Sequence, residues 1–150
     1  GHHNPLLTGV VVFVVFAASA AGQAVSVRTA VRTALLSGTA ILILGLAGLA
    51  LGIGTTTLSL LVIGGVIAGV GQGLSFRSAL GAVTGGAPPD QRAAVSSSFF
   101  AVCYVGISLP VIGVGAASDS YGLVHTGVVF AAIMATLSAG ALASLARSTA

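Results

Sequence analysis

Long apolar runs alternate with short polar connections along the whole chain. An α-helix needs about 20 mostly apolar residues to cross the hydrocarbon core of a bilayer, and each run is close to that length. The connections contain the glycine, proline and charged residues that end helices or form turns. The pattern predicts an all-α fold, a polytopic transmembrane helical bundle of about five helices, as a single membrane domain over residues 1–150. We expect the spans at residues 5–24, 34–54, 58–84, 93–117 and 124–145.

The connection between the third and fourth spans has the clearest helix-ending signal. It contains Pro88 and Pro89. Proline lacks a backbone amide hydrogen, and it disfavours a helical conformation in the residue before it. Asp90 follows, and aspartate is a favourable residue at a helix N-cap. We therefore predict that Asp90 caps the fourth helix, and that Arg28 and Arg32 lie in the connection between the first two helices.

The composition requires a lipid environment. Hydrophobic residues make up 56% of the chain and charged residues only 5%, whereas soluble proteins have about 25% charged residues. So few charges cannot cover a surface exposed to water, and the lipid bilayer is therefore the first partner that we predict. The basic residues are scattered singly along the chain, a distribution that argues against binding of nucleic acid.

The few charges also predict a topology. If five helices alternate in direction, the arginines of the connections and of the C-terminal end all fall on one side of the membrane. These arginines are Arg28, Arg32, Arg92 and Arg147. The positive-inside rule assigns this side to the cytoplasm. We therefore expect a multi-pass protein of the inner cell membrane, with the N-terminus of the chain outside and the C-terminus in the cytoplasm. An odd number of spans that starts outside predicts a fragment of a larger protein.

Glycine recurs every fourth residue in the third span, where side chains four apart lie along one ridge of a helix. Such a ridge lets a second helix backbone approach closely, which is how many helices associate in lipid. We predict that this helix packs through its glycines, and that Arg77 occupies the one position of the series where glycine is missing. The glycines of the ridge are Gly65, Gly69, Gly73, Gly81 and Gly85.

The segment GQGLSFRSALGAVTGGAPPDQRAAVSSSFFAVCYVGISLPVIGVG, residues 71–115, resembles the tenth and eleventh helices of major facilitator superfamily transporters, especially bacterial drug-efflux-like members. The similar features are the glycine-rich helix, the Pro-Pro-x-x-Arg inner loop and the Ser-Leu-Pro-Val helix. The resemblance implies a partial major-facilitator-type fold in which residues 5–147 are the last five of twelve helices. Those twelve form two halves that work by alternating access.

The same resemblance implies a function and partners. The expected function is secondary active efflux of drugs or small metabolites, by a segment that is inactive alone. The expected partners are an N-terminal transporter half, a small-molecule substrate of unknown identity and protons as the candidate coupling ion. Of the motif Gly-x-x-x-Asp-Arg-x-Gly-Arg, which that family often has in this half, only Gly22, Arg28 and Arg32 remain.

Small polar residues in the third and fourth spans are candidates for the wall of a substrate cavity. Gln72 and Ser75 lie three apart near mid-membrane, and we expect them to share a helix face. Ser97, Tyr104 and Ser108 follow the spacing of one face of the fourth span. Two interpretations stay open for all five residues: they line an aqueous cavity, or they form hydrogen bonds and close packing between helices.

Arg77 places a charge within a span, which is unfavourable in lipid and marks a functional or polar environment. Three roles fit the sequence. Arg77 pairs with Asp90 or anchors to lipid, it forms a gate with an acid elsewhere in the transporter, or it contacts substrate. Asp90 and Arg92 are the other charged candidates for a gate.

Pro110 lies inside the fourth span, where it removes the backbone hydrogen bond to the carbonyl of Gly106. A kink is expected at this position. Two interpretations stay open: Gly106 and Pro110 form a hinge for a rocking movement, or the kink is static.

The chain offers few residues for catalysis. It has two acids far apart in sequence, and it lacks a Ser/His/Asp set, paired carboxylates and a metal-binding cluster. We therefore predict that it is not an enzyme and binds no cofactor or metal, including at His2 and His3. Two alternatives to the transporter segment stay open. One is a small membrane scaffold or interaction protein that uses the glycine-rich face, and the other is a five-helix drug/metabolite-type transporter repeat.

Overall fold

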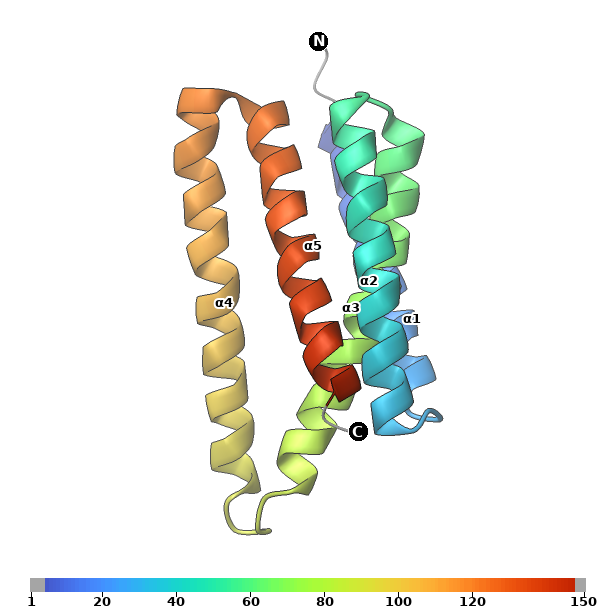
Figure 1. Ribbon diagram of the computed structural model, residues 1–150, viewed down its shortest axis with the longest axis vertical. Helices are drawn as coiled ribbons and strands as arrows, with labels where there is room; N and C mark the ends of the chain where they lie inside the picture. The colour runs from blue at the N-terminus through green and yellow to red at the C-terminus, as the bar shows by residue number, and fades with distance from the viewer. Residues whose placement is uncertain (1–4, 148–150) are drawn as a thin grey trace.

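The structure is a computed structural model that describes residues 5–147. Within these residues, five α-helices follow one another with short turns between them, and all five are long and apolar enough to cross a membrane. They run alternately up and down, so the first residue of α1 and the last residue of α5 lie at opposite ends of the bundle (Figure 1). The helices are α1 (Pro5–Ser26), α2 (Val31–Gly54), α3 (Leu58–Gly85), α4 (Arg92–Tyr121) and α5 (Leu123–Arg147). The predicted all-α bundle of five potential spans is confirmed.

Two predictions about the ends of the helices are wrong. α2 begins one residue before Arg32, so Arg32 lies in its first turn and only Arg28 lies in the connection. Asp90 does not cap α4, because Gln91 holds the N-cap position and no side-chain hydrogen bond caps the helix. The cause is a turn in which the amide of Gln91 donates to the carbonyl oxygen of Pro88 at 2.9 Å. This turn contains Asp90 and delays the start of the helix.

α3 lies between α1 and α2 and presents glycine to both. On the α1 side, a Cβ added at Gly69 would lie 2.7 Å from the carbonyl oxygen of Val15. On the α2 side, a Cβ added at Gly64 would lie 2.5 Å from the amide nitrogen of Leu49. Real side chains cannot come this close to a backbone, so α3 contacts both neighbours backbone to backbone, as small residues allow in lipid.

The predicted glycine ridge is confirmed for part of its length. Gly65, Gly69 and Gly73 all face α1. At Gly81 and Gly85, in contrast, a Cβ would meet no atom within 4 Å in the part of the chain that the structure describes. The prediction that Gly81 packs against a neighbouring helix is therefore wrong. The reason is that α1 has ended before it reaches these two residues.

α5 packs against α2. Ala131 of α5 is buried, and Gly127 lies close to α2, where an added Cβ would come within 3.3 Å of the Ile53 side chain. α1, α2, α3 and α5 thus form one packed group.

α4 stands apart from this packed group. None of its 30 residues, all of which the structure describes, is buried. Its contact with α3 is an aromatic cluster in which the ring centroid of Phe76 lies 5.6 Å from that of Phe99 and 6.1 Å from that of Phe100. Tilted rings at these distances attract each other. Figure 1 shows α4 beside α5 and at a distance from α1 and α2.

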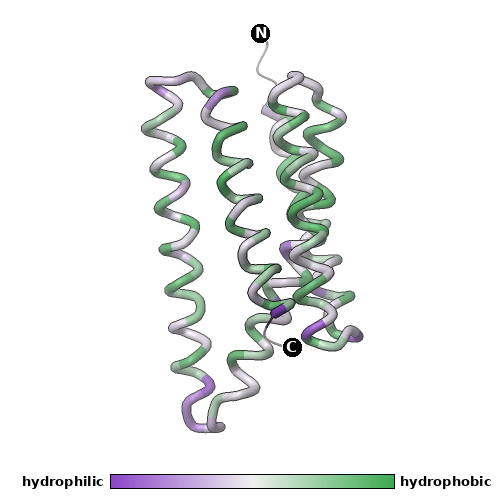
Figure 2. Tube along the Cα trace, viewed as in Figure 1, coloured by the Kyte–Doolittle hydropathy of each residue, from purple (hydrophilic) through white to green (hydrophobic). Residues whose placement is uncertain are grey.

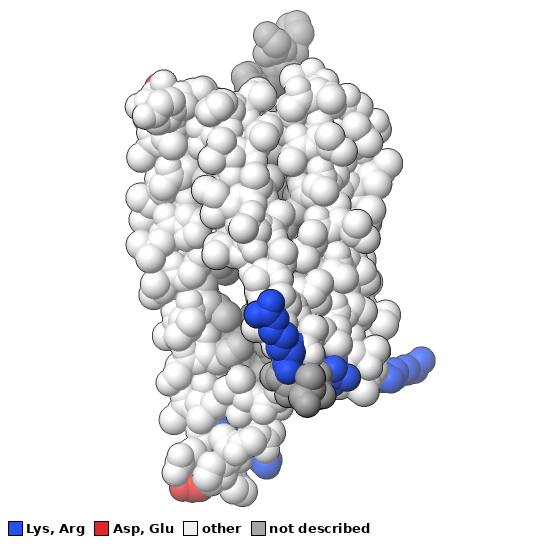
Figure 3. Space-filling view, viewed as in Figure 1, with Lys and Arg blue, Asp and Glu red and all other residues white. Residues whose placement is uncertain are grey.

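Most residues along the middle of the helices are apolar, and polar residues are more frequent near the turns (Figure 2). Phe13 and Phe16 are each 71% exposed, which is unfavourable in water and favourable in hydrocarbon. The basic side chains visible in Figure 3 gather at the end of the molecule where α1 and α5 end. An apolar surface with charges confined to its ends is consistent with a multi-pass membrane protein.

Candidate functional site

The predicted polar stripe of α4 lies on the outside of the bundle. Ser97, Tyr104 and Ser108 are all exposed, and the Tyr104 side chain is among the most accessible, at 70%. Phe99 and Cys103, which are half-buried, lie on the side of α4 that faces the other helices. Within the described residues the stripe is therefore an open face rather than the wall of an enclosed cavity.

Gln72 and Ser75 do not share an environment. Gln72 is exposed, and its Oε1 accepts a hydrogen bond of 2.6 Å from the Ser19 hydroxyl of α1. The Ser75 hydroxyl points toward α2, where a Cβ added at Gly38 would lie 2.6 Å from it. The Ser75 Oγ is buried and has no hydrogen-bond partner among the described residues. The prediction of one shared face is wrong, because the boundary between the α1 and α2 contacts of α3 falls between these two residues.

Arg77 is exposed, and it lies toward one end of the bundle. The next residue, Ser78, shares a buried hydrogen bond of 3.2 Å with Ser26, the last residue of α1. Arg77 therefore lies level with the end of α1, at the end of the bundle where the basic side chains gather. No ion pair joins it to Asp90 in the part of the chain that is described, so the structure does not contain the pairing considered above.

The other gate candidates are Asp90, which lies in the turn between α3 and α4, and Arg92, which is the first residue of α4. The Arg92 Nε donates a hydrogen bond of 3.3 Å to the carbonyl oxygen of Ala87, which ties the start of α4 to the residues that follow α3. Asp90 is exposed in the same turn. Arg92 thus stabilises the turn, whereas Asp90 is an exposed residue within it. Among the described residues, neither side chain bonds to Arg77.

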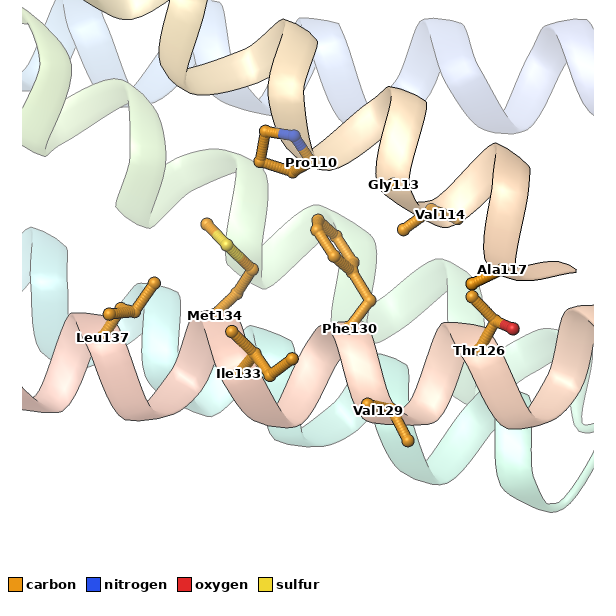
Figure 4. A pocket seen from close by; sticks show the side chains of 10 residues that line it. All are labelled: Pro110, Gly113, Val114, Ala117, Thr126, Val129, Phe130, Ile133, Met134 and Leu137. Atoms are coloured by element: carbon orange, nitrogen blue, oxygen red, sulfur yellow. The ribbon is translucent and has the colours of Figure 1, made fainter. Parts of the chain in front are cut away.

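An apolar groove of about 340 Å³ lies between α4 and α5 (Figure 4). Pro110 lines it from α4, which continues through this residue as one helix. Phe130 and Met134 line it from α5. Thr126 lies at one end, and its Oγ1 is buried with no hydrogen-bond partner in the described chain. Gly106, the other residue of the predicted hinge, faces open space. α4 thus contains the proline and also borders the open groove.

Sequence reasoning missed the groove and the aromatic cluster. A signal for the cluster was present, because Phe76 and the pair Phe99 and Phe100 lie at similar distances on either side of the Pro-Pro turn. A helical hairpin around that turn brings them side by side. The groove has no comparable signal, since it depends on how closely α4 approaches α5.

The described residues hold no group of three or more His, Cys, Asp or Glu side chains that could bind a metal ion. Cys103 is half-buried on α4, and His125 is exposed in the first turn of α5. His2 and His3 lie outside the described residues. The absence of a metal, a cofactor and enzyme activity stays a prediction.

The resemblance to major facilitator transporters rests on the residues of this chain alone. No protein-family model, curated protein or solved structure matches the chain. The five-helix bundle is shown by the structure, whereas the resemblance to major facilitator transporters stays a prediction.

Proposed function

We propose that this chain is part of a secondary active transporter of the inner membrane that exports drugs or small metabolites by alternating access. The observation that supports this proposal most is the exposed polar face of α4, formed by Ser97, Tyr104 and Ser108. A hydroxyl group that faces hydrocarbon has no water with which to form hydrogen bonds. A helix with such a stripe is therefore more stable beside an aqueous cavity or another helix than beside lipid chains.

The packing of α4 is compatible with this position. Its half-buried residues face α3 and α5, which leaves the polar face free to meet other helices. We propose that these helices belong to the second half of the transporter. The substrate cavity then lies between the two halves, where Tyr104 and Ser108 contact the substrate.

The uneven packing also supports a rocking movement. α3 contacts both α1 and α2 backbone to backbone, and such contacts leave little room for movement. α4 instead borders an open groove and contains Pro110, which removes a backbone hydrogen bond and makes the helix easier to bend. We assign α4 to the moving wall of the cavity, with Gly106 and Pro110 as its hinge.

The distribution of charge supports an orientation and limits the mechanism. The arginine-bearing end of the bundle faces the cytoplasm by the positive-inside rule. Asp90 lies in the α3–α4 turn and Asp119 in the last turn of α4, so the carboxylates of the described chain lie near helix ends. If protons are the coupling ion, the carboxylate that carries them at mid-membrane belongs to the partner helices.

The scaffold alternative loses its main support. It needs a glycine-rich face that is free to bind a partner helix. Gly65, Gly69 and Gly73 are instead covered by α1 of the same chain. The face of α4 that does remain open is polar, and a polar face suits a cavity.

Thiol accessibility in native membranes tests the proposal. In a Cys103→Ser background, single cysteines replace Tyr104 or Ser108 on the polar face. A cysteine at Leu109 is the matched control, since Leu109 is 66% exposed on an apolar side of the same helix. A charged thiol reagent reacts with thiolates in contact with water, so we expect labelling of the polar-face cysteines at least about tenfold faster than labelling at position 109. Equal labelling at all three positions would contradict an aqueous cavity.

A further inference from the structure

A second polar site lies at the arginine-bearing end of the bundle, away from the polar face of α4. It is a groove of about 340 Å³ between the α1–α2 connection and the last turns of α3. Its lining combines polar groups and aliphatic side chains in about equal measure. The polar residues are Ser26, Thr29, Arg77, Ser78 and Thr84.

We propose that this groove binds the phosphate of an anionic phospholipid, and that Arg77 is the residue that contacts the phosphate. Arg77 is exposed, and among the described residues it has no ion pair or hydrogen bond. A guanidinium group presents parallel N–H donors that match two oxygens of a phosphate. Because Arg77 lies level with the end of α1, its side chain is placed at the depth where lipid headgroups begin.

The hydroxyl groups of the groove favour an anion as the ligand. Thr29 and Thr84 each donate to a backbone carbonyl four residues earlier, so their protons are already used. Ser26 and Ser78 share a single hydrogen bond, in which one hydroxyl donates and the other accepts. The accepting hydroxyl keeps its own proton, which can be donated to a ligand oxygen. The lining thus offers donors from a guanidinium and a hydroxyl, and none of the described residues that form it carries a carboxylate.

The shape of the groove favours a lipid over a free phosphate ion. Gly81 lies one helical turn after Arg77, and a Cβ added there would meet no atom within 4 Å in the described chain. The missing side chain leaves space beside the guanidinium. Val27, Val31 and Leu80 line the rest of the groove. A free phosphate ion would use only the donors, whereas a phospholipid uses the donors for its headgroup and the aliphatic side chains for its glycerol and acyl chain.

The surrounding charge favours an anionic headgroup over a zwitterionic one. The basic side chains gather at this end of the molecule. Asp90 is the one carboxylate of the described chain at this end, and it is exposed in the α3–α4 turn rather than in the groove. A net positive end attracts anionic lipid, and each arginine near the surface adds to the attraction.

Native mass spectrometry of the full chain in detergent micelles tests the proposal. The protein is titrated with phosphatidylglycerol, with phosphatidylcholine and with inorganic phosphate. We expect Arg77→Gln to weaken retention of phosphatidylglycerol about tenfold, since it loses both the paired hydrogen bonds and one surface charge. Arg147→Gln removes the same charge from the end of α5, outside the groove, and we expect it to weaken retention by about threefold or less.

A second variant fills the groove without changing any charge. We expect Gly81→Leu to weaken retention of phosphatidylglycerol about as much as Arg77→Gln. Gly113→Leu on α4 is its control, because Gly113 also faces open space but lies outside this groove. Circular dichroism in phosphatidylcholine micelles tests whether each variant keeps its helices. If Arg77→Gln does not fold, the retention of phosphatidylglycerol by Gly81→Leu tests the proposal.

Two outcomes would overturn the proposal. One is an equal loss of phosphatidylglycerol in Arg77→Gln and Arg147→Gln, which would mean that only the overall charge matters. The other is displacement of the lipid by millimolar inorganic phosphate, which would identify a free anion as the ligand. Neither result bears on the polar face of α4, so the transporter proposal is tested separately.

Discussion

α3 and α4 follow each other in the chain and are held in opposite ways. α3 lies between α1 and α2 and has eight buried residues, whereas α4 has none. Five of the eight are glycines, which contribute almost no apolar area. α3 is therefore held by close backbone contact, and α4 by aromatic rings at one end and looser contacts with α5.

The difference between α3 and α4 shows that large apolar residues do not determine packing in this molecule. Val102 and Leu109 of α4 are 73% and 66% exposed, although in a soluble protein such residues would drive burial. In lipid they gain little from leaving hydrocarbon for another helix, so small residues that permit close contact decide which helices associate. A Cβ added at Gly106 or Gly115 of α4 would meet no atom of the described residues within 4 Å, and this helix accordingly packs least.

The largest effect is expected where a glycine of α3 is replaced. A side chain at Gly73 would collide with the backbone of α1 at Ser19. We expect Gly73→Leu to lower the free energy of unfolding by about 3 kcal/mol, at the upper end for overpacked positions. Gly115→Leu is the control on α4, because a Cβ added at Gly115 would meet no atom within 4 Å in the described chain. We expect this control to change the free energy of unfolding by less than about 0.5 kcal/mol. Unfolding in mixed micelles of increasing SDS content, followed by circular dichroism, measures both. Equal effects would remove the distinction between the two helices.

A smaller effect is expected at the contact between α3 and α4. Phe76→Ala removes the ring that contacts both Phe99 and Phe100. We expect a loss of about 1 kcal/mol, typical of an aromatic pair, and faster hydrogen exchange in the first turns of α4. Phe13→Ala, which removes a ring that is 71% exposed on α1, provides the control. Unchanged exchange in α4 would show that other contacts hold this helix.

The smallest effect is expected at the hydrogen bond between Ser19 and Gln72. A double-mutant cycle with Ser19→Ala and Gln72→Ala isolates the coupling between the two side chains. We expect about 0.6 kcal/mol, the average for hydrogen bonds between membrane helices. Thr136→Ala combined with Gln72→Ala serves as control, because the Thr136 hydroxyl bonds within α5. A coupling of zero would leave Gln72 free for substrate, as the cavity interpretation requires.

The five helices could be predicted from the sequence because length and hydropathy alone decide whether a segment can span a bilayer. The ridge of Gly65, Gly69 and Gly73 was also visible, since spacing by four defines a helix face. The sequence did not reveal a second face, with Gly64 and Gly71 against α2. A second ridge on the same helix is recognised only when the positions of both neighbours are known.

The candidate site was predicted in part. The spacing of Ser97, Tyr104 and Ser108 placed them on one face of α4, but it could not show whether another helix covers that face. For Gln72 and Ser75 the sequence instead suggested too much, because residues three apart in a helix were expected to share one environment. Their surroundings differ because two different helices meet α3 on either side of them.

The lengths of the helices have one more consequence. α1 has 22 residues, whereas α3 and α4 have 28 and 30. At ~1.5 Å per residue the last two measure roughly 42 and 45 Å, well beyond the ~30 Å hydrocarbon core of a bilayer. Figure 1 shows their connection extending past the ends of the other helices. The tip around Pro88 therefore stands in water on the cytoplasmic side in the proposed orientation, where a protease, an antibody or a soluble protein can reach it without entering the membrane.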